Sequence, residues 1–253
     1  MQLNRFVDAK NAELARLRAA PPIPCGTITR RPFLKIAPHI QIIAEYKRAS
    51  PSKGMISTRY LPEDIATLYT QGGARAISVL TEERYFDGRL DYLEQIAQHT
   101  ALPLLRKDFI FDELQVLETA TTPASAVLLI VALTPTVEHL YRLRTLAESF
   151  GIQAVVEIFN EQELDMARAS GARYIQVNSR NLETLVVDPQ NTLRLMNYRH
   201  NSEFWIAASG ISSRTDLNRL TGYDAALIGT ALMASPDPLT TLRSLTHDEQ
   251  LTH

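Results

Sequence analysis

Several short apolar runs along the chain end in side chains that could move protons or hold charge. They are Glu45 and Lys47 in the first such run, Lys107 in a later one, and then Glu157 and Asn178. Ammonium groups can donate protons and carboxylates can accept them, so this set has the residue types that general acid–base catalysis needs. Each of these residues taken alone is more often structural. Together, at four run ends, they predict a site.

The spacing within two of these runs places the charged side chains on one face. Side chains alternate along a strand, so Glu45 and Lys47 share a face with Ile43, and Lys107 shares one with Leu105. If the apolar members point inward, an acid and two amines lie near the mouth of a sheet or barrel. The structural alternative for Glu45 and Lys47 is a salt bridge at the end of the strand.

The later runs add a buried acid, an amide and a cation. Glu157 interrupts the apolar stretch Val155–Ile158, and a buried carboxylate without a partner is costly, so a lysine or a reaction should account for it. Asn178 ends the next run in the same way, and Arg180 follows it in the loop. We expect all three near the same mouth.

Two glycine-bearing loops near the C-terminus predict a phosphate site. Ser209-Gly210 and Gly229-Thr230 each follow an apolar run and precede a helical pattern, whose free amides favour an anion. Ser50, in the turn Ser50-Pro-Ser-Lys-Gly54, adds a hydroxyl. The alternative is that Gly210 and Gly229 only shape tight turns.

The elements that position these residues form a repeated pattern. Eight short apolar runs alternate with longer segments of helical periodicity, as parallel strands and helices do in (β/α)₈ barrels. The runs are Ile42–Tyr46, Ala76–Leu80, Pro103–Leu105, Ala126–Val131, Ala154–Ile158, Tyr174–Val177, Phe204–Ala207 and Ala225–Ile228. An open, doubly wound sheet is the alternative, but the chain lacks a G-x-G-x-x-G first turn. We therefore predict an α/β fold, a (β/α)₈ TIM barrel whose strand ends carry the chemistry.

The first forty residues stand apart from this repeat. Apolar positions between residues 3 and 18 predict one amphipathic helix, which Pro21 and Pro22 stop. We expect residues 1–253 to form a single barrel domain with residues 1–40 as an N-terminal extension.

Composition excludes several classes of protein. The 26 Lys and Arg against 28 Asp and Glu leave a net charge of −2, which argues against non-specific nucleic-acid binding. The single Cys25 can form neither an internal disulfide nor a thiolate metal cluster, and its proline-rich surroundings disfavour a nucleophilic role. No secretory signal or membrane span is visible, so we expect a cytoplasmic protein. The sequence leaves the oligomeric state open.

Four strings carry a family resemblance. Ile43-Ala-Glu-Tyr-Lys-Arg-Ala-Ser-Pro-Ser-Lys-Gly54 resembles the first-strand motif of indole-3-glycerol phosphate synthases, and three later strings match in order: Ile77–Glu82 with Tyr85 and Phe86, Arg106–Ile110, and Asn178–Leu182. The resemblance implies a (β/α)₈ barrel whose N-terminal extension covers the mouth. It also implies the substrate 1-(2-carboxyphenylamino)-1-deoxyribulose 5-phosphate, which closes a ring, loses CO₂ and then loses water.

The resemblance implies a role for each residue, with no metal or organic cofactor. Lys107 would be the acid for ring closure, and Lys47 would hold the substrate carboxylate or act as acid in dehydration. Glu157 would be the base, while Glu45 and Asn178 would orient the lysines and the substrate hydroxyls. The binding residues would be Arg180 at the anilino end, Phe86 and Phe109 as walls for the aromatic ring, and Ser50, Ser209, Gly210, Gly229 and Thr230 around the phosphate.

Two departures from the family pattern fall close to these residues. Ala208 stands where the family usually has Glu, and Gln176-Val177 stands where it usually has Gly-Ile. The first raises two alternatives: a diverged paralogue acting on a related phosphorylated amino-sugar, or a silent barrel that binds a ligand or partner. A silent barrel should have lost one of Lys47, Lys107 and Glu157, and all three are present.

Overall fold

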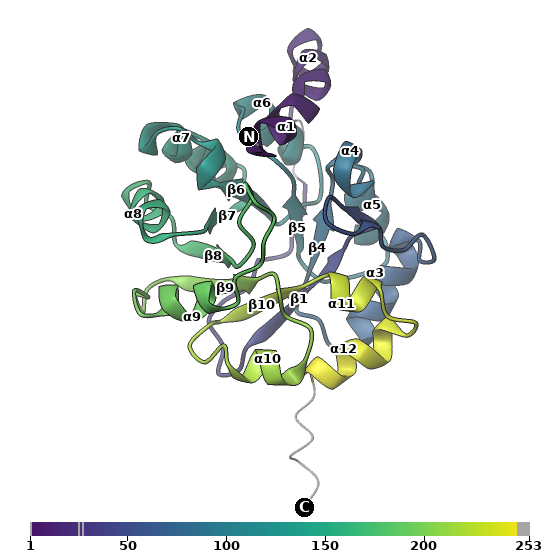
Figure 1. Ribbon diagram of the computed structural model, residues 1–253. Coiled ribbons are helices and arrows are strands. Elements are labelled where there is room, and N and C mark those ends of the chain that lie inside the picture. Colours follow the sequence, from purple (N-terminus) through teal and green to yellow (C-terminus); the bar gives the residue numbers. More distant parts are fainter. Residues whose placement is uncertain (1, 25, 27, 247–253) are drawn as a thin grey trace, which may run out of the picture.

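The computed structural model describes residues 2–24, 26 and 28–246, and within these ranges eight parallel strands close into a barrel. Their order around the ring follows the chain, with β10 pairing β1 to close it (Figure 1). The strands are β1 (Gln41–Tyr46), β4 (Ala76–Leu80), β5 (Leu104–Lys107), β6 (Ala126–Ile130), β7 (Gln153–Ile158), β8 (Tyr174–Asn178), β9 (Phe204–Ala208) and β10 (Ala225–Ile228). The closed ring confirms the barrel and excludes the open sheet.

Helices surround the strand ring on the outside (Figure 1). The outer helices are α3 (Pro62–Gln71), α5 (Tyr92–Ala97), α6 (Glu113–Ala120), α7 (Val137–Ser149), α8 (Glu161–Ala169), α9 (Gln190–Met196), α10 (Arg214–Asn218) and α12 (Pro238–Thr246). Shorter elements lie in the loops between strands and helices: the hairpin β2 (Ala49–Ser50) and β3 (Gly54–Met55), α4 (Glu83–Phe86), the 3₁₀ turn η1 (Val131–Leu133) and α11 (Thr230–Met233).

The apolar residues divide between two layers. One cluster lies between the strands and the helices, and the other fills the inside of the ring. Ile43 and Leu105 belong to the inner cluster, so the residues that share their faces, Glu45 and Lys107, also point inward. The two-residue period of the strands therefore delivers these charged groups to the barrel interior.

The N-terminal extension differs from the single helix predicted over residues 3–18. It forms α1 (Gln2–Ala9) and α2 (Asn11–Ala19), separated at Lys10, whose N–H bonds to the Val7 carbonyl three residues earlier. The Lys10 side chain is buried against Asp108 of the barrel, at 2.8 Å. The periodicity within each helix was visible in the sequence, but this buried contact, which fixes the break, was not.

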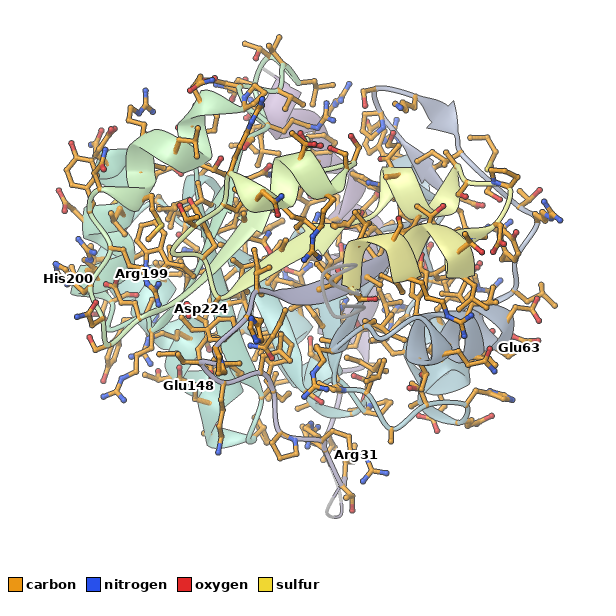
Figure 2. All side chains as sticks on the ribbon, turned by 90° about the horizontal axis from the view of Figure 1, so that it is seen from below. Arg31, Glu63, Glu148, Arg199, His200 and Asp224 are labelled. Carbon is orange, nitrogen blue, oxygen red and sulfur yellow. The ribbon has the colours of Figure 1, made fainter. Side chains whose placement is uncertain are left out.

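The extension reaches both ends of the barrel. Phe6 of α1 packs at the mouth on Phe109, whereas Phe33 and Leu34 belong to the inner cluster and lie next to the start of β8, where Tyr174 donates to the Leu34 carbonyl. In the side view of Figure 2, Arg31 lies at the lower end of the molecule. Thus α1 covers the mouth, and the later part of residues 1–40 closes the opposite end.

The strand predicted at Pro103–Leu105 runs instead from Leu104 to Lys107. Arg106 ends the apolar pattern in the sequence, but it is buried on the helix side of β5 among carboxylates, with Glu118 at 3.1 Å. Ion pairing therefore extends the strand by two residues and makes Lys107 its last residue. Cys25 lies outside the described residues, and no helix within the described ranges is long and apolar enough to cross a membrane.

Candidate active site

Two lysines share one buried carboxylate at the mouth of the barrel. Glu45 lies at the end of β1, with Lys47 Nζ 2.7 Å from its Oε2 and Lys107 Nζ 3.4 Å from its Oε1. Burial raises the pKa of Glu45, but the charges of Lys47 and Lys107 outweigh burial and hold that pKa below its ordinary value. The salt bridge between Glu45 and Lys47 does form, and the second one, with Lys107, joins β1 to β5, far apart in the sequence.

The same carboxylate keeps Lys107 charged. Burial alone lowers the pKa of Lys107, and the negative charges of Glu45 and Glu157 overcome it, so the pKa lies above its ordinary value. Lys107 therefore carries a proton throughout the neutral pH range. A protonated amine that reaches into a cavity can donate that proton to a developing oxyanion.

Glu157 is held by amides rather than by a lysine. Its Oε2 accepts a hydrogen bond from Gln176 Nε2 at 2.5 Å, and its Oε1 accepts one from Asn178 Nδ2 at 3.0 Å. The register of β7 and β8 places Gln176 directly beside Glu157. The buried carboxylate thus has the partners that the sequence alone could not supply, and Lys107 acts on it only through its charge.

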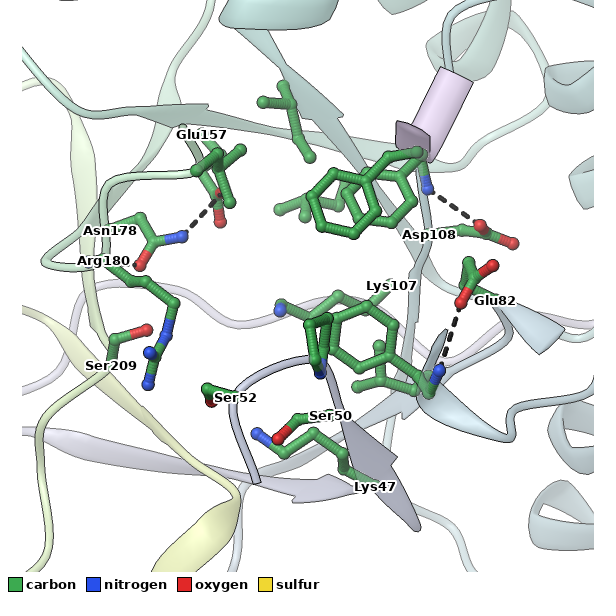
Figure 3. Close-up of a pocket in the computed structure, with 18 of the residues that line it drawn as sticks. Lys47, Ser50, Ser52, Glu82, Lys107, Asp108, Glu157, Asn178, Arg180 and Ser209 are labelled. Carbon is green, nitrogen blue, oxygen red and sulfur yellow. Dashed lines mark hydrogen bonds between the residues drawn. The ribbon is translucent and has the colours of Figure 1, made fainter. Parts of the chain in front are cut away.

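The loop after β8 positions Arg180. Asn178 Oδ1 accepts from the Arg180 N–H at 2.9 Å, and the Arg180 side chain donates to the Leu185 carbonyl at 2.7 Å. Burial lowers the pKa of Arg180. Figure 3 shows Glu157, Asn178 and Arg180 on one side of the pocket and Lys47 and Ser50 on another.

A polar cavity of about 400 Å³ occupies the half of the mouth next to β9 and β10. Ser209, Gly210, Gly229 and Thr230 all line it together with Lys47 and Lys107, and Ser50 lines the adjoining aromatic cavity, which Ser209 and Thr230 also border. The Ser50 hydroxyl accepts from the Lys53 N–H within its own hairpin. Ser209 and Gly210 both have positive φ, 69° and 76°, so this turn exposes backbone that most residues could not.

Gly229 has a steric requirement that the sequence did not reveal. A Cβ at this position would lie 2.0 Å from Glu45 Oε2, closer than any real contact. The glycine therefore makes room for the carboxylate that both lysines share. It borders the polar cavity as expected, and it also fixes where Glu45 can lie.

An aromatic cavity adjoins the polar one. Phe86 and Phe109 both line it, with ring centroids 6.1 Å apart. Phe6 joins them and stacks on Phe109, with centroids 4.3 Å apart and planes 18° from parallel. The site therefore has one cavity with an aromatic wall opposite charged side chains and a second, polar cavity, and Lys47 and Lys107 are among the residues that line both.

Phe6, Lys53 and Gln176 are among the residues of this site that the sequence analysis did not single out. Phe6 lies on the apolar face of the N-terminal helix, and its aromatic type was the available signal. Lys53 lines the polar cavity, and it belongs to the same turn that singled out Ser50. Gln176 gave no signal beyond its departure from the family pattern, because its role depends on a cross-strand contact.

Fold and site together define a (β/α)₈-barrel enzyme with its titratable side chains gathered at the C-terminal ends of the strands. The chain matches the family model for indole-3-glycerol phosphate synthase over residues 12–245. It is 45% identical over 212 residues to the indole-3-glycerol phosphate synthase of Dehalococcoides mccartyi strain CBDB1, covering 81% of each chain. It is 46% identical over 196 residues to that of Acetivibrio thermocellus, covering 77% of this chain and 75% of the relative.

Among solved structures, 3-hexulose-6-phosphate synthase from Salmonella typhimurium superposes with a TM-score of 0.64. The match covers 82% of this chain and 97% of that one, and at 16% identity it supports the fold alone. The chain belongs to the indole-3-glycerol phosphate synthase family, as its four motifs suggested, and this is a family of lyases.

Proposed function

We propose that this barrel, acting as a single domain, converts 1-(2-carboxyphenylamino)-1-deoxyribulose 5-phosphate to indole-3-glycerol phosphate. The observation that carries the assignment to these residues is the pair of ammonium groups sharing Glu45, between an aromatic and a polar cavity. The aromatic cavity matches the flat ring of the substrate, and the polar cavity matches its phosphorylated end.

Lys107 acts as the acid in ring closure. The ring carbon that bears the carboxylate attacks the C2′ carbonyl carbon, and the carbonyl oxygen takes the Lys107 proton as a C–C bond forms. Loss of CO₂ then returns its electron pair to the ring. The raised pKa of Lys107 supports this role because the amine is protonated before the attack.

Lys47 and Glu157 act around the carboxylate and in the dehydration. Lys47 pairs with the substrate carboxylate or protonates the departing hydroxyl, while Glu157 is the base that takes the proton lost in the dehydration, from C1′ next to the nitrogen. The nitrogen lone pair assists the break of the C2′–O bond, and the hydroxyl leaves as water, which forms a cationic ring. Loss of one C1′ proton then leaves its electron pair as the C1′=C2′ double bond, and the indole ring is complete with its N–H kept. Asn178 and Glu45 orient the groups that carry these protons.

The remaining residues bind the two ends of the substrate. Phe86 and Phe109 face the aromatic ring, and Arg180 supports the anilino end. The phosphate end is held by Ser50 and by the two glycine-bearing loops, with Ser209, Gly210, Gly229 and Thr230. Ala208 borders the polar cavity, so this position supplies no carboxylate to it.

Replacing Lys107 by Ala tests this assignment. The kcat should fall by about 10²- to 10⁴-fold, the usual contribution of one general acid, while KM changes much less. Indole fluorescence reports the product directly. Lys35→Ala, an exposed lysine at the opposite end of the barrel, is the matched control and should retain wild-type turnover.

The same assay separates the alternatives. No fluorescence from the wild-type protein would indicate a silent barrel, and fluorescence with a better rate on another phosphorylated amino-sugar would indicate a diverged paralogue. Near-normal turnover of Lys107→Ala would remove that lysine from the mechanism. The near-neutral charge supports a small-molecule substrate over a nucleic acid, and a cytoplasmic site of action is part of this proposal.

A further inference from the structure

Gln176 is a buried amide that the mechanism above leaves without a task. It lies inside the barrel on β8, fully buried, and it lines neither the aromatic nor the polar cavity. Its side chain therefore lies below the substrate-binding surface. Any effect on the reaction has to pass through a neighbouring side chain.

That neighbour is Glu157. Gln176 Nε2 donates to Glu157 Oε2 at 2.5 Å, while Asn178 donates to the other oxygen. The two amides come from one strand, two residues apart, and together they fix both the position and the rotation of the carboxylate plane. A base that must accept a proton from a bound substrate depends on such a fixed orientation.

The orientation of Gln176 is unfavourable for stability alone. Because its nitrogen faces the carboxylate, its Oε1 points away and has no hydrogen-bond partner among the described residues. A buried amide oxygen without a partner destabilises the fold. An apolar side chain of the same length would avoid this cost but would leave Glu157 Oε2 without this donor, so the carboxylate and not packing explains why glutamine stands here.

Two departures from the family pattern meet at this carboxylate. Gln176 pairs in register with Glu157, and Ala208 pairs in register with Asn178, the other holder of Glu157. Gln176 supplies an amide and Ala208 supplies no carboxylate within a single patch of the barrel interior. Positions 176 and 208 thus both adjoin the hydrogen-bond network around Glu157.

We propose that Gln176 is a positioning residue that holds Glu157 in the orientation in which it takes a proton from the substrate. This inference rests on the proposed function of Glu157 as the base. Gln176 acts through Glu157 alone, and it secures that carboxylate in a site where position 208 supplies no acid.

A double-mutant cycle with Gln176→Met and Glu157→Gln tests the inference. Methionine keeps the length of the side chain and removes the donor. In Gln176→Met, kcat should fall about 10- to 100-fold with KM within about threefold, since a hydrogen bond to a charged group is lost. In the double variant, kcat should equal that of Glu157→Gln alone, because Gln176 then has no carboxylate to hold.

Thermal unfolding separates positioning from a structural role. The melting temperature of Gln176→Met should stay close to that of the wild type, because removal of the unpartnered oxygen offsets the lost hydrogen bond to Glu157. Gln176→Leu provides a second donor-free variant if the methionine variant does not fold. Gln153→Met is the matched control, a glutamine on the neighbouring strand whose amide meets only a backbone carbonyl, and it should leave kcat unchanged.

The outcomes are distinct. Near-normal kcat in Gln176→Met, or losses that multiply in the double variant, would overturn the inference. If Glu157→Gln alone keeps wild-type kcat, Glu157 is not the base. The proposed function of Glu157 then fails, and the inference about Gln176 fails because it rests on that function. A fall in kcat that follows a fall in melting temperature would make Gln176 structural.

Discussion

At the scale of single residues, the charge balance of the mouth sets the chemistry. Lys47 and Lys107, both partly exposed, lie within reach of the buried Glu45, so this trio carries a net positive charge. Such a charge is stable only beside further negative charge, which Glu157 supplies in part. A substrate that brings a carboxylate and a phosphate completes the balance, and expulsion of CO₂ removes one negative charge as the reaction proceeds.

Glu45→Gln should narrow the pH range of the enzyme. Burial lowers the pKa of Lys107 and the charges of Glu45 and Glu157 raise it, so removing one of those charges must bring the pKa down. The alkaline limb of kcat/KM should therefore move by about one pH unit to lower pH. Glu63→Gln, on the outer helix α3, should leave the profile in place. If the alkaline limb of kcat/KM does not move in Glu45→Gln, the ionisation of Lys107 does not determine that limb.

The effect of restoring an acid at position 208 depends on Gln176. Ala208 lies beside Asn178 across the two strands, so Ala208→Glu would compete with Glu157 for the Asn178 amide and place a like charge nearby. We expect kcat/KM to fall about tenfold in Ala208→Glu and to fall further when Gln176→Gly is added, because Glu157 then loses its second amide donor as well. Steady-state kinetics decide between this result and a site that gains from the added acid, in which case Ala208→Glu alone would be faster.

At the scale of the elements, the contact of α1 with β5 ties the cover of the mouth to the strand that carries Lys107. Lys10 pairs with Asp108, the residue after Lys107, and Phe6 stacks on Phe109, the next one. Arg106 and Lys10 together depress the pKa of Asp108 to about 2, against the effect of burial. The ionised carboxylate of Asp108 thus stabilises both the end of β5 and the N-terminal extension that covers the mouth.

Lys10→Met should destabilise the protein and make it more sensitive to acid. The folded pKa of Asp108 lies below its unfolded value, so its stabilisation is complete above about pH 4 and is lost as the pH falls toward 2. Loss of Lys10 should cost about 3 kcal/mol at neutral pH and shift acid unfolding to higher pH. Urea unfolding at several pH values measures both.

The exposed pair of Arg142 with Glu113 provides the control for Lys10. Its two side chains are 57% and 54% exposed, and Arg142→Met should change the free energy of unfolding by less than about 0.5 kcal/mol. Equal effects of the two substitutions would show that the Lys10 pair contributes no more than a surface pair.

The strands were predictable from the sequence because each is apolar on both faces. The runs at Ala76–Leu80 and Ala225–Ile228 match β4 and β10 residue for residue. The β5 boundary was not predictable, since Arg106 is charged and its buried carboxylate partners come from outside its own strand. The pattern of apolar residues along the sequence shows which segments are buried. It does not show which charged residues will form buried ion pairs.

The candidate site divides in the same way. The two-residue period was enough to place Glu45 and Lys107 on inward faces, and strand ends were enough to gather the rest. Gln176 and Phe6 required the register between neighbouring strands and the path of the extension, which no local pattern contains. The sequence therefore predicted which residues meet at the mouth of the barrel. It did not predict the hydrogen bonds and ring contacts between them.

At the scale of the whole molecule, the extension links the two ends of the barrel. The Arg30 guanidinium donates to the carbonyls of Ala120 and Ala124 and to that of Phe150. Ala120 ends α6 and Phe150 caps α7, so one cation meets the C-terminal ends of two helices, where a positive charge is favourable. This contact is at the opposite end from the chemistry.

Arg30→Met should therefore separate stability from activity. We expect a loss of about 2 kcal/mol in the free energy of unfolding, from several charge-assisted hydrogen bonds and the helix ends they cap. At temperatures where the variant stays folded, kcat and KM should match the wild type. Urea unfolding and indole fluorescence on the same preparation measure both, and a changed kcat would mean that the two ends of the barrel are coupled.

The contact between Gly229 and Glu45 also limits how this barrel can diversify. Any side chain at position 229 displaces the carboxylate that both lysines need, so this position is closed to variation for as long as the chemistry is kept. Thr230 and Ser209 border the same cavity and carry no such restriction from Glu45. New preferences for the phosphorylated end of a substrate should therefore arise through these neighbours, and glycine should persist at 229 in every active descendant.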